Sequence, residues 1–150
     1  MANLLVLHGP NLNLLGNRDP LMYGHTSLDT LDQRLVDQAQ QLGHVLRCFQ
    51  SNAESDLINL IQQAPKEGIN FMIINPAAYT HTSIALRDAV AAVRIPFIEV
   101  HITNIYAREP FRHQSFFSDL AIGTLTGLGV RGYEFALTYA NQYLSEHTHN

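Results

Sequence analysis

The stretch NLLVLH, residues 3–8, is a run of apolar side chains between an asparagine and a histidine. A strand without polar alternation is typical of a parallel sheet that is buried on both faces. Further runs of strand length lie at 44–50, 69–74, 97–101 and 121–126. The first strand is therefore expected to pair with four others.

Helical patterns separate these strands. Apolar residues at three- and four-residue spacing predict a helix over 27–42, with Gly43 as its C-terminal cap. Ser51 and Glu54 form the capping-box pattern that opens a second helix. The remaining helices are expected over 82–93 and 130–144.

Alternating strands and helices predict an α/β protein with a flavodoxin-like, doubly wound, five-stranded parallel sheet in three α/β/α layers. The length of 150 residues suits one domain, 1–150. Within it we expect a lid loop at about 17–26 and a frayed tail at about 146–150.

Composition narrows the class of protein. The net charge of −4 disfavours a nucleic-acid partner, which would need a basic surface. No apolar run approaches the ~20 residues of a membrane span, and no basic segment precedes the first apolar run as in a signal peptide. A cytoplasmic protein is expected. Cys48 is the one cysteine, so no intramolecular disulfide can form, and its apolar surroundings predict a buried thiol.

The ends of the strands hold the polar residues that could form a site. In doubly wound sheets, ligands bind beyond the carboxyl ends of the strands, near the point where strand order reverses. Polar residues follow the first, third and fourth predicted strands, which places them together at one edge. These residues are Asn11, Asn75, His81, Glu99, His101, Thr103, Arg108 and Arg112.

Most of these residues also have a structural interpretation. Asparagines close turns, and one of Thr80, Thr82 and Ser83 is expected to cap the third helix. His81 is equally consistent with a surface histidine near a helix start. The two arginines are equally consistent with solvated loop charges.

Glu99 and His101 are harder to explain in this way. They lie two apart on one strand, so both side chains point to the same face, and each is costly to bury unpaired. A structural pair and a catalytic pair both remain open. A metal site formed by His81, Glu99 and His101 is disfavoured because no metalloprotease-type spacing is present.

A glycine-rich motif, residues 127–132, follows the fifth predicted strand and matches GxGxxG. It comes too late in the chain for the βαβ unit that a dinucleotide-binding fingerprint needs. We interpret it as a tight strand-to-helix turn.

The loop between Gly9 and Gly24 contains Arg18 and Tyr23. Loops of this length are usually functional or disordered. Removing the proton from a tyrosine at pH 7 costs about 4 kcal/mol. One cation at ~4 Å, with an effective dielectric constant of about 20, supplies about as much. Tyr23 is therefore either a hydrophobic lid residue or a base that Arg18, assisted by Arg108, keeps ionised.

Four segments together resemble the type II 3-dehydroquinate dehydratases. These segments are HGPNLNLLGNRDPLMYG, INPAAYTHTSIALRDA, IPFIEVHITNIYAREPFRHQSFFSD and the turn from Gly127 to Tyr133. The resemblance covers nearly the whole chain. It implies a cofactor-free anti elimination of water from 3-dehydroquinate, through an enolate and without a lysine Schiff base, in the shikimate pathway of aromatic amino acid biosynthesis or in quinate breakdown.

The resemblance also implies roles for single residues. Tyr23 would be the base, held ionised by Arg18, and His101 the acid, oriented by Glu99. Asn11 would position a water that stabilises the enolate. Substrate would be held at its carboxylate by Ile102 and Thr103 and at its ring hydroxyls by Asn75, His81 and Arg112, with Arg108 supporting the lid.

The same resemblance implies a dodecamer built from trimers, in which Asp88 reaches a neighbouring active site. Thr103 stands where serine is common, which keeps the hydroxyl and adds a methyl group. Two rival functions stay open: a non-catalytic module that binds small anions, and a flavin or nucleotide carrier. Pro10 disfavours the carrier because it lacks an N–H for a phosphate.

Overall fold

The computed structural model describes residues 1–147. One five-stranded parallel sheet forms its centre, in the order β2-β1-β3-β4-β5. The strands are β1 (Asn3–His8), β2 (Val45–Gln50), β3 (Phe71–Asn75), β4 (Phe97–His101) and β5 (Gly123–Thr126). This is the strand order of a flavodoxin-like, doubly wound sheet, so the predicted fold class is confirmed.

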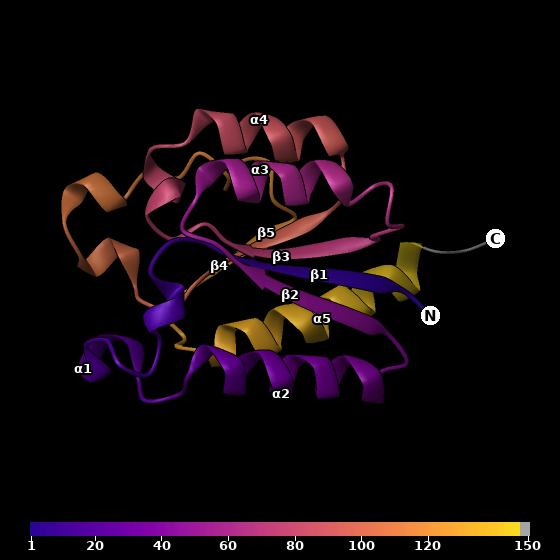
Figure 1. Ribbon diagram of the computed structural model, residues 1–150, viewed down its shortest axis with the longest axis horizontal. Coiled ribbons are helices and arrows are strands. Elements are labelled where there is room, and N and C mark those ends of the chain that lie inside the picture. The colour runs from indigo at the N-terminus through magenta and orange to yellow at the C-terminus, as the bar shows by residue number, and fades with distance from the viewer. Residues whose placement is uncertain (148–150) are drawn as a thin grey trace.

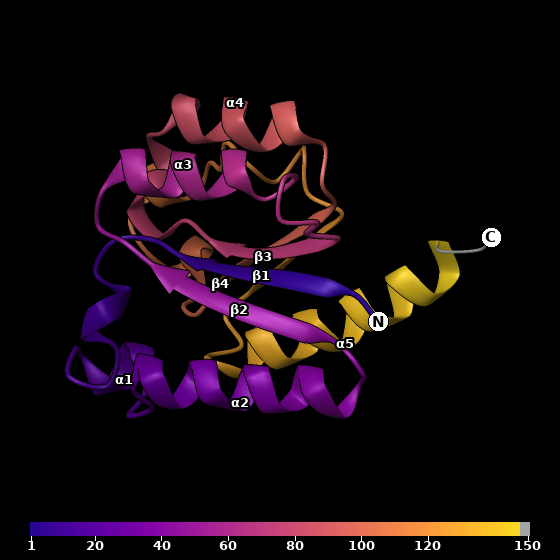
Figure 2. The ribbon, with the colours of Figure 1, turned by 45° about the vertical axis from the view of Figure 1, so that its right-hand side comes forward.

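Helices cover both faces of the sheet (Figures 1 and 2). The helices α2 (Leu28–Gln41) and α5 (Arg131–His147) pack on one face, and α3 (Glu54–Gln63) and α4 (Ile84–Val93) pack on the other. Side chains of β1 alternate between the two cores, with Leu4 and Val6 in one and Leu5 and Leu7 in the other. This double burial explains the continuous apolar run of the first strand.

Short helices occupy the loops at the carboxyl edge of the sheet. They are η1 (Leu12–Leu14), α1 (Pro20–Tyr23), η2 (Ala77–His81), η3 (Ile105–Ala107) and η4 (Pro110–Arg112). The predicted lid segment, 17–26, thus contains one helical turn, α1, which begins at a proline. Its movement as a lid stays a prediction.

Helix starts differ in part from the predicted caps. The capping box of Ser51 and Glu54 is wrong: α3 begins after Ala53, and the Ser51 hydroxyl instead accepts the Ala53 N–H and donates to Asp56. The prediction of a cap before α4 is confirmed, because the Ser83 hydroxyl accepts the Leu86 N–H.

The C-terminal elements also differ from their predicted bounds. Strand β5 begins at Gly123 and not at 121, and α5 continues beyond 144 to His147. Glu146 and His147 are therefore helical, whereas the rest of the predicted frayed tail, 148–150, lies outside the described residues. Over 1–147, no helix combines the length and the apolar character that a membrane crossing requires.

Candidate active site

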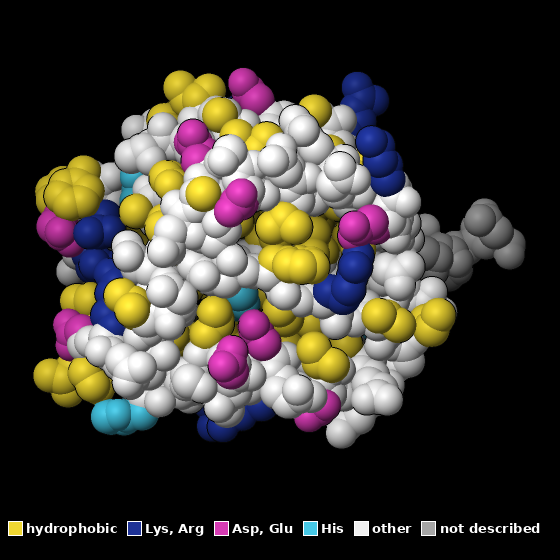
Figure 3. Space-filling view, in the orientation of Figure 1, with side chains coloured by type: hydrophobic (Ala, Val, Ile, Leu, Met, Phe, Trp, Pro, Cys, Tyr) yellow, Lys and Arg dark blue, Asp and Glu magenta, His cyan; other side chains and the backbone are white. Residues whose placement is uncertain are grey.

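A pocket opens at the carboxyl ends of β1, β3 and β4. Its walls come from the segments that follow these three strands and from the loop that carries α1. The chain order places β2 and β3 on opposite sides of β1, so the pocket lies where the strand order reverses. Figure 3 shows Lys and Arg side chains gathered near this edge, at the left of the view.

The pocket brings together ten of the twelve predicted site residues. They are Asn11, Arg18, Tyr23, Asn75, His81, His101, Ile102, Thr103, Arg108 and Arg112. Glu99 lies behind His101, and Asp88 is exposed on α4, outside the lining of the pocket. Pro10, Leu12, Ala77, Ala78 and Ile105 complete the lining.

Close backbone packing sets the shape of this edge. A Cβ atom on Gly9 would lie 2.3 Å from the carbonyl oxygen of Pro76, so only glycine allows the β1 and β3 loops to approach this closely. Gly127 has a positive φ of +86° and donates its N–H to the His101 carbonyl. The glycine-rich motif is thus the predicted tight turn between β5 and α5, and it supports the end of β4.

A histidine–glutamate pair forms one wall of the pocket. Glu99 and His101 are both buried on β4, and the Glu99 Oε2 atom lies 2.5 Å from the His101 Nε2 atom. Two hydroxyls complete the shell of this carboxylate: Ser115 donates to Oε2 at 2.8 Å, and Ser118 donates to Oε1 at 2.7 Å. A buried carboxylate with three donors has its hydrogen-bonding capacity well satisfied.

The charge state of this pair follows from its hydrogen bonds. Burial by itself raises the pKa of Glu99, but the hydrogen bonds and charge of His101, together with the hydroxyls of Ser118 and Ser115, outweigh it and hold the pKa below its ordinary value. Glu99 is therefore a carboxylate, which accepts the His101 Nε2–H. The Nδ1 atom of His101 makes no hydrogen bond with any residue in 1–147 and is left for the pocket.

Sequence reasoning missed Ser115 and Ser118. Their Oγ atoms reach Glu99 across 16 and 19 residues of chain. Ser115 also accepts the N–H groups of Phe117 and Ser118, which folds the segment into a turn that aims both hydroxyls. A pair of serines three residues apart is a common turn pattern and signals no particular partner.

The loop side of the pocket is cationic. Arg108 Nη1 donates to the Tyr23 hydroxyl at 3.1 Å and to the Thr103 hydroxyl at 3.3 Å. The Arg18 guanidinium lies over the face of the Tyr23 ring, 4.3 Å from its centroid. The cation that reaches the phenolic oxygen is thus Arg108, whereas Arg18 contacts the ring by a cation–π interaction.

Hydrogen bonds also orient the residues on the β3 side. The Asn75 Oδ1 atom accepts the Ala77 N–H, and His81 Nδ1 lies 2.8 Å from the Gln114 carbonyl. A carbonyl can only accept, so Nδ1 of His81 carries the proton and Nε2 is an acceptor. Burial lowers the pKa of His81 below its ordinary value. The hydrogen bond to the Gln114 carbonyl opposes this change, whereas the charges of His101 and Arg112 add to it.

Within residues 1–147, the ligand atoms of His81, Glu99 and His101 do not come together as a group that could hold a metal ion. The rings of His81 and His101 stack with centroids 6.5 Å apart, and Glu99 is enclosed by His101 and the two serines.

Asn11 enters the pocket from a left-handed backbone conformation with φ of 70°, which asparagine tolerates better than most residues.

Fold and pocket together define a doubly wound α/β protein whose strand-end pocket combines arginines, a tyrosine and a buried histidine–glutamate pair. The family model for dehydroquinase class II matches residues 2–141. The chain therefore belongs to the class II dehydroquinase family.

Individual relatives agree with this family. The chain is 59% identical to a 3-dehydroquinate dehydratase of Nitrosomonas eutropha, over 93% of this chain and 97% of that protein. It is 60% identical to one of Legionella pneumophila, over 91% of this chain and 94% of that protein. Its structure resembles the type II dehydroquinase of Propionibacterium acnes with a TM-score of 0.90 and 43% identity, over 95% and 97% of the two chains.

Proposed function

We propose that this chain, a 3-dehydroquinate dehydratase and hydro-lyase, removes water from 3-dehydroquinate by an anti elimination in which Tyr23 is the base and His101 the acid. The supporting observation is that one pocket receives two different proton-handling groups from separate elements. Tyr23 comes from the loop after β1, and His101 from the end of β4. An anti elimination needs this separation because the proton and the hydroxyl leave from opposite faces of the ring.

Tyr23 is suited to act as the base. The N–H of Arg108 that points to its oxygen favours the phenolate, and Arg18 adds a second positive charge over the ring. The phenolate removes a proton from the carbon beside the ketone, and the electron pair of that C–H bond passes into an enolate. Asn11, at the same pocket, would position a water that donates a hydrogen bond to the enolate oxygen.

His101 is suited to complete the elimination. The Glu99 carboxylate stabilises the imidazolium form and holds it through Nε2, so Nδ1 presents its proton to the pocket. As the enolate collapses, the C–O bond to the hydroxyl breaks and this proton leaves with the hydroxyl as water. The product, 3-dehydroshikimate, then has a double bond conjugated to its ketone.

The remaining pocket residues are suited to bind substrate. The backbone at Ile102 and Thr103, together with the Thr103 hydroxyl, would hold the carboxylate. Asn75, His81 and Arg112 would hold the ring hydroxyls, and the Nε2 atom of His81 would accept a hydrogen bond from one of them. The one lysine of the chain, Lys66, is exposed and lies outside the pocket lining, which supports chemistry without a Schiff base.

The assembly is a further part of the proposal. Asp88 is exposed on α4 and does not line the pocket of its own chain, so a role in catalysis requires a neighbouring subunit, as in the proposed dodecamer. The Asp88→Ala variant should then bind 3-dehydroquinate more weakly while its monomeric unit stays folded. Wild-type KM in an intact oligomer would remove Asp88 from the site.

An ultraviolet assay with 3-dehydroquinate tests the function directly, because the conjugated product absorbs where the substrate does not. The enzyme is incubated with borohydride and substrate before the assay. Activity that survives this treatment is expected. Activity lost only when both reagents are present would reveal an imine and overturn the mechanism, and no activity in the untreated enzyme would favour an anion-binding module.

A further inference from the structure

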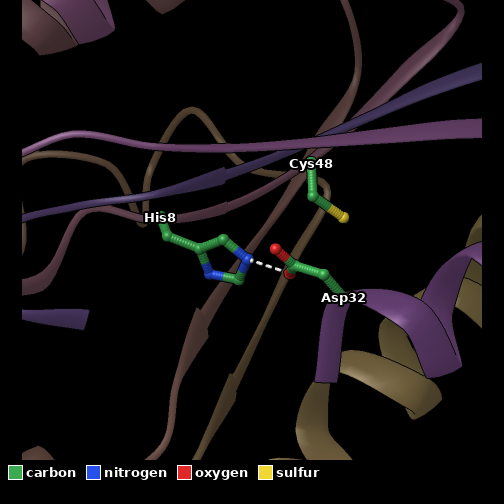
Figure 4. A group of neighbouring side chains, drawn as sticks. All are labelled: His8, Asp32 and Cys48. Carbon is green, nitrogen blue, oxygen red and sulfur yellow. Dashed lines mark hydrogen bonds and ion pairs between the residues drawn. The ribbon is translucent and has the colours of Figure 1, made fainter. Parts of the chain in front are cut away.

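A second polar cluster lies under the pocket, between the sheet and α2. His8 at the end of β1, Asp32 on α2 and Cys48 on β2 place their polar atoms within 4.8 Å of one another. Figure 4 shows the imidazole of His8 facing the Asp32 carboxylate, which lies between the two strands and the helix. Nothing in the predicted chemistry of the pocket uses these three residues.

Hydrogen bonds close this cluster and leave no open set of metal ligands. His8 Nε2 lies 2.7 Å from the Asp32 Oδ1 atom, and its Nδ1 lies 3.0 Å from the Tyr133 hydroxyl. Burial, reinforced by the charge of Asp32, raises the pKa of the Cys48 thiol, which therefore keeps its proton. Both ring nitrogens of His8 already have partners within the protein.

The direction of each hydrogen bond can be assigned from Asn75. Its Oδ1 atom accepts the Ala77 N–H, so the atom that faces Tyr133, at 2.9 Å, is the Nδ2 donor. The Tyr133 oxygen accepts from Asn75, and its own proton is directed to Nδ1 of His8. Nε2 of His8 then carries a proton, which it donates to Asp32. This series of hydrogen bonds begins at Asn75 in the pocket and ends at the carboxylate of Asp32, whose side chain is 25% exposed.

We propose that Tyr133 and His8 are positioning residues that fix the side chain of Asn75 in the substrate pocket. Asn75 is 3% exposed, and two of its hydrogen bonds hold the plane of its amide. One N–H of Nδ2 remains for a ligand. Tyr133 and His8 are both completely buried, so this support is shielded from water and sterically confined.

The neighbouring backbone depends on the same amide. Ala77 adopts a positive φ of 53°, which is uncommon for a residue with a side chain, and its N–H is the donor to Asn75. If Asn75 loses its acceptor at Tyr133, the amide can rotate and this turn loses its partner. Both changes occur in the pocket wall, because Asn75 and Ala77 line it.

The Tyr133→Phe variant tests this proposal because it removes one oxygen and preserves the ring. The proposal rests on Asn75 holding a ring hydroxyl in the proposed function. We expect KM for 3-dehydroquinate to rise about fivefold with kcat within about twofold, the pattern of lost uniform binding. Tyr143→Phe is the matched control on the same helix; it lies outside the pocket lining and should leave both constants unchanged.

A double-mutant cycle separates positioning from a merely structural role. In an Asn75→Ala background, Tyr133→Phe should change KM less than twofold, because the residue through which it acts is gone. An equal change in both backgrounds would overturn the proposal. An unchanged KM in Tyr133→Phe would overturn it too, if Asn75→Ala alone weakens binding. An unchanged KM in Asn75→Ala would instead remove Asn75 from the proposed function.

A second variant covers the case in which Tyr133→Phe does not fold. Asp32→Asn changes the partly exposed end of the chain and preserves side-chain size. It weakens the acceptor for His8, so KM should rise about twofold without a change in kcat. An unchanged KM, or a fall in kcat alone, would contradict the positioning role.

Discussion

Within residues 1–147, two histidine–carboxylate pairs lie at strand ends, and only one of these two opens into the pocket. At the end of β1, His8 pairs with Asp32 at 2.7 Å, and at the end of β4, His101 pairs with Glu99 at 2.5 Å. The two pairs have similar nitrogen–oxygen distances and the same kinds of side chain. They differ in which member of the pair, the histidine or the carboxylate, makes further hydrogen bonds with other residues.

In the β1 pair, the histidine has its hydrogen-bonding atoms fully occupied. In the β4 pair, it is the carboxylate that has its hydrogen-bonding atoms occupied. His8 has partners on both ring nitrogens, and Asp32 is partly exposed. Glu99 is buried and accepts from two serines besides His101, whose second nitrogen is left for a ligand. A histidine can exchange a proton with substrate only when one ring nitrogen is accessible. The hydrogen bonds on both nitrogens therefore suit His8 to the proposed supporting role, and the open Nδ1 suits His101 to the proposed role of acid.

The largest expected effect concerns Tyr23, the proposed base, which would act together with the β4 pair. Tyr23→Phe removes the hydroxyl that Arg108 contacts and leaves the ring beneath Arg18. Because general base catalysis contributes about 10²–10⁴-fold, kcat should fall by about that factor, with substrate affinity nearly unchanged. Steady-state kinetics together with calorimetric binding would show this split. High residual turnover would remove Tyr23 from the role of base.

The next effect compares the two histidines directly. His101→Ala should lower kcat by about 10²–10³-fold, because it removes the proposed general acid for the leaving hydroxyl. His8→Asn should act through KM instead, with a much smaller change in kcat. Both variants are compared by kcat and KM after their folding is verified by circular dichroism. A larger loss of kcat in His8→Asn than in His101→Ala would reverse the assignment of support and reactive group.

Much of this arrangement could be predicted from the sequence. Apolar runs and helical spacing predict the sheet and its layers, because burial on two faces leaves a strong local pattern. Glu99 and His101 were predictable as a pair, because residues two apart on a strand share a face.

The partners of each pair were not predictable. Ser118 approaches Glu99 across 19 residues, and Tyr133 approaches His8 across 125. Such contacts depend on how loops and helices dock, and no local spacing encodes them. The false capping box at Ser51 has the same origin, since a local pattern can be satisfied by another partner, here Asp56.

A moderate effect is expected from Glu99→Gln, which removes the charge of the β4 pair and keeps its shape. His101 would lose the carboxylate proposed to stabilise its imidazolium form, so kcat should fall about 10–100-fold, the loss seen when the carboxylate partner of a metal-bound histidine is removed. Glutamine can still accept the Nε2–H, so KM should change little. A kcat within twofold of wild type would show that orientation alone, without charge, suffices.

The same variant has a defined pH dependence. The pKa of Glu99 in the folded protein is below its ordinary value, so this group stabilises the folded state above the unfolded pKa, and the contribution is lost as pH falls through the folded pKa. The difference in unfolding free energy between wild type and Glu99→Gln should therefore shrink as pH falls below about 4.5. Urea unfolding across that range measures it, and a difference that grows toward acid would contradict the lowered pKa.

The smallest effects are expected when one hydrogen-bond donor is removed from each of the two carboxylates, Glu99 and Asp32. Ser118→Ala removes one donor from Glu99, and a hydrogen bond to a charged group contributes about 1.5–3 kcal/mol to stability. Because the pKa of Glu99 rises when this donor is lost, the carboxylate supports His101 less well, and kcat should fall a few-fold. Cys48→Ala removes the thiol that faces Asp32, which already reaches solvent, so kcat and KM should stay within about twofold of wild type. If Ser118→Ala and Cys48→Ala lowered kcat equally, Asp32 would matter to turnover as much as Glu99 does. The two pairs would then differ in position but not in function.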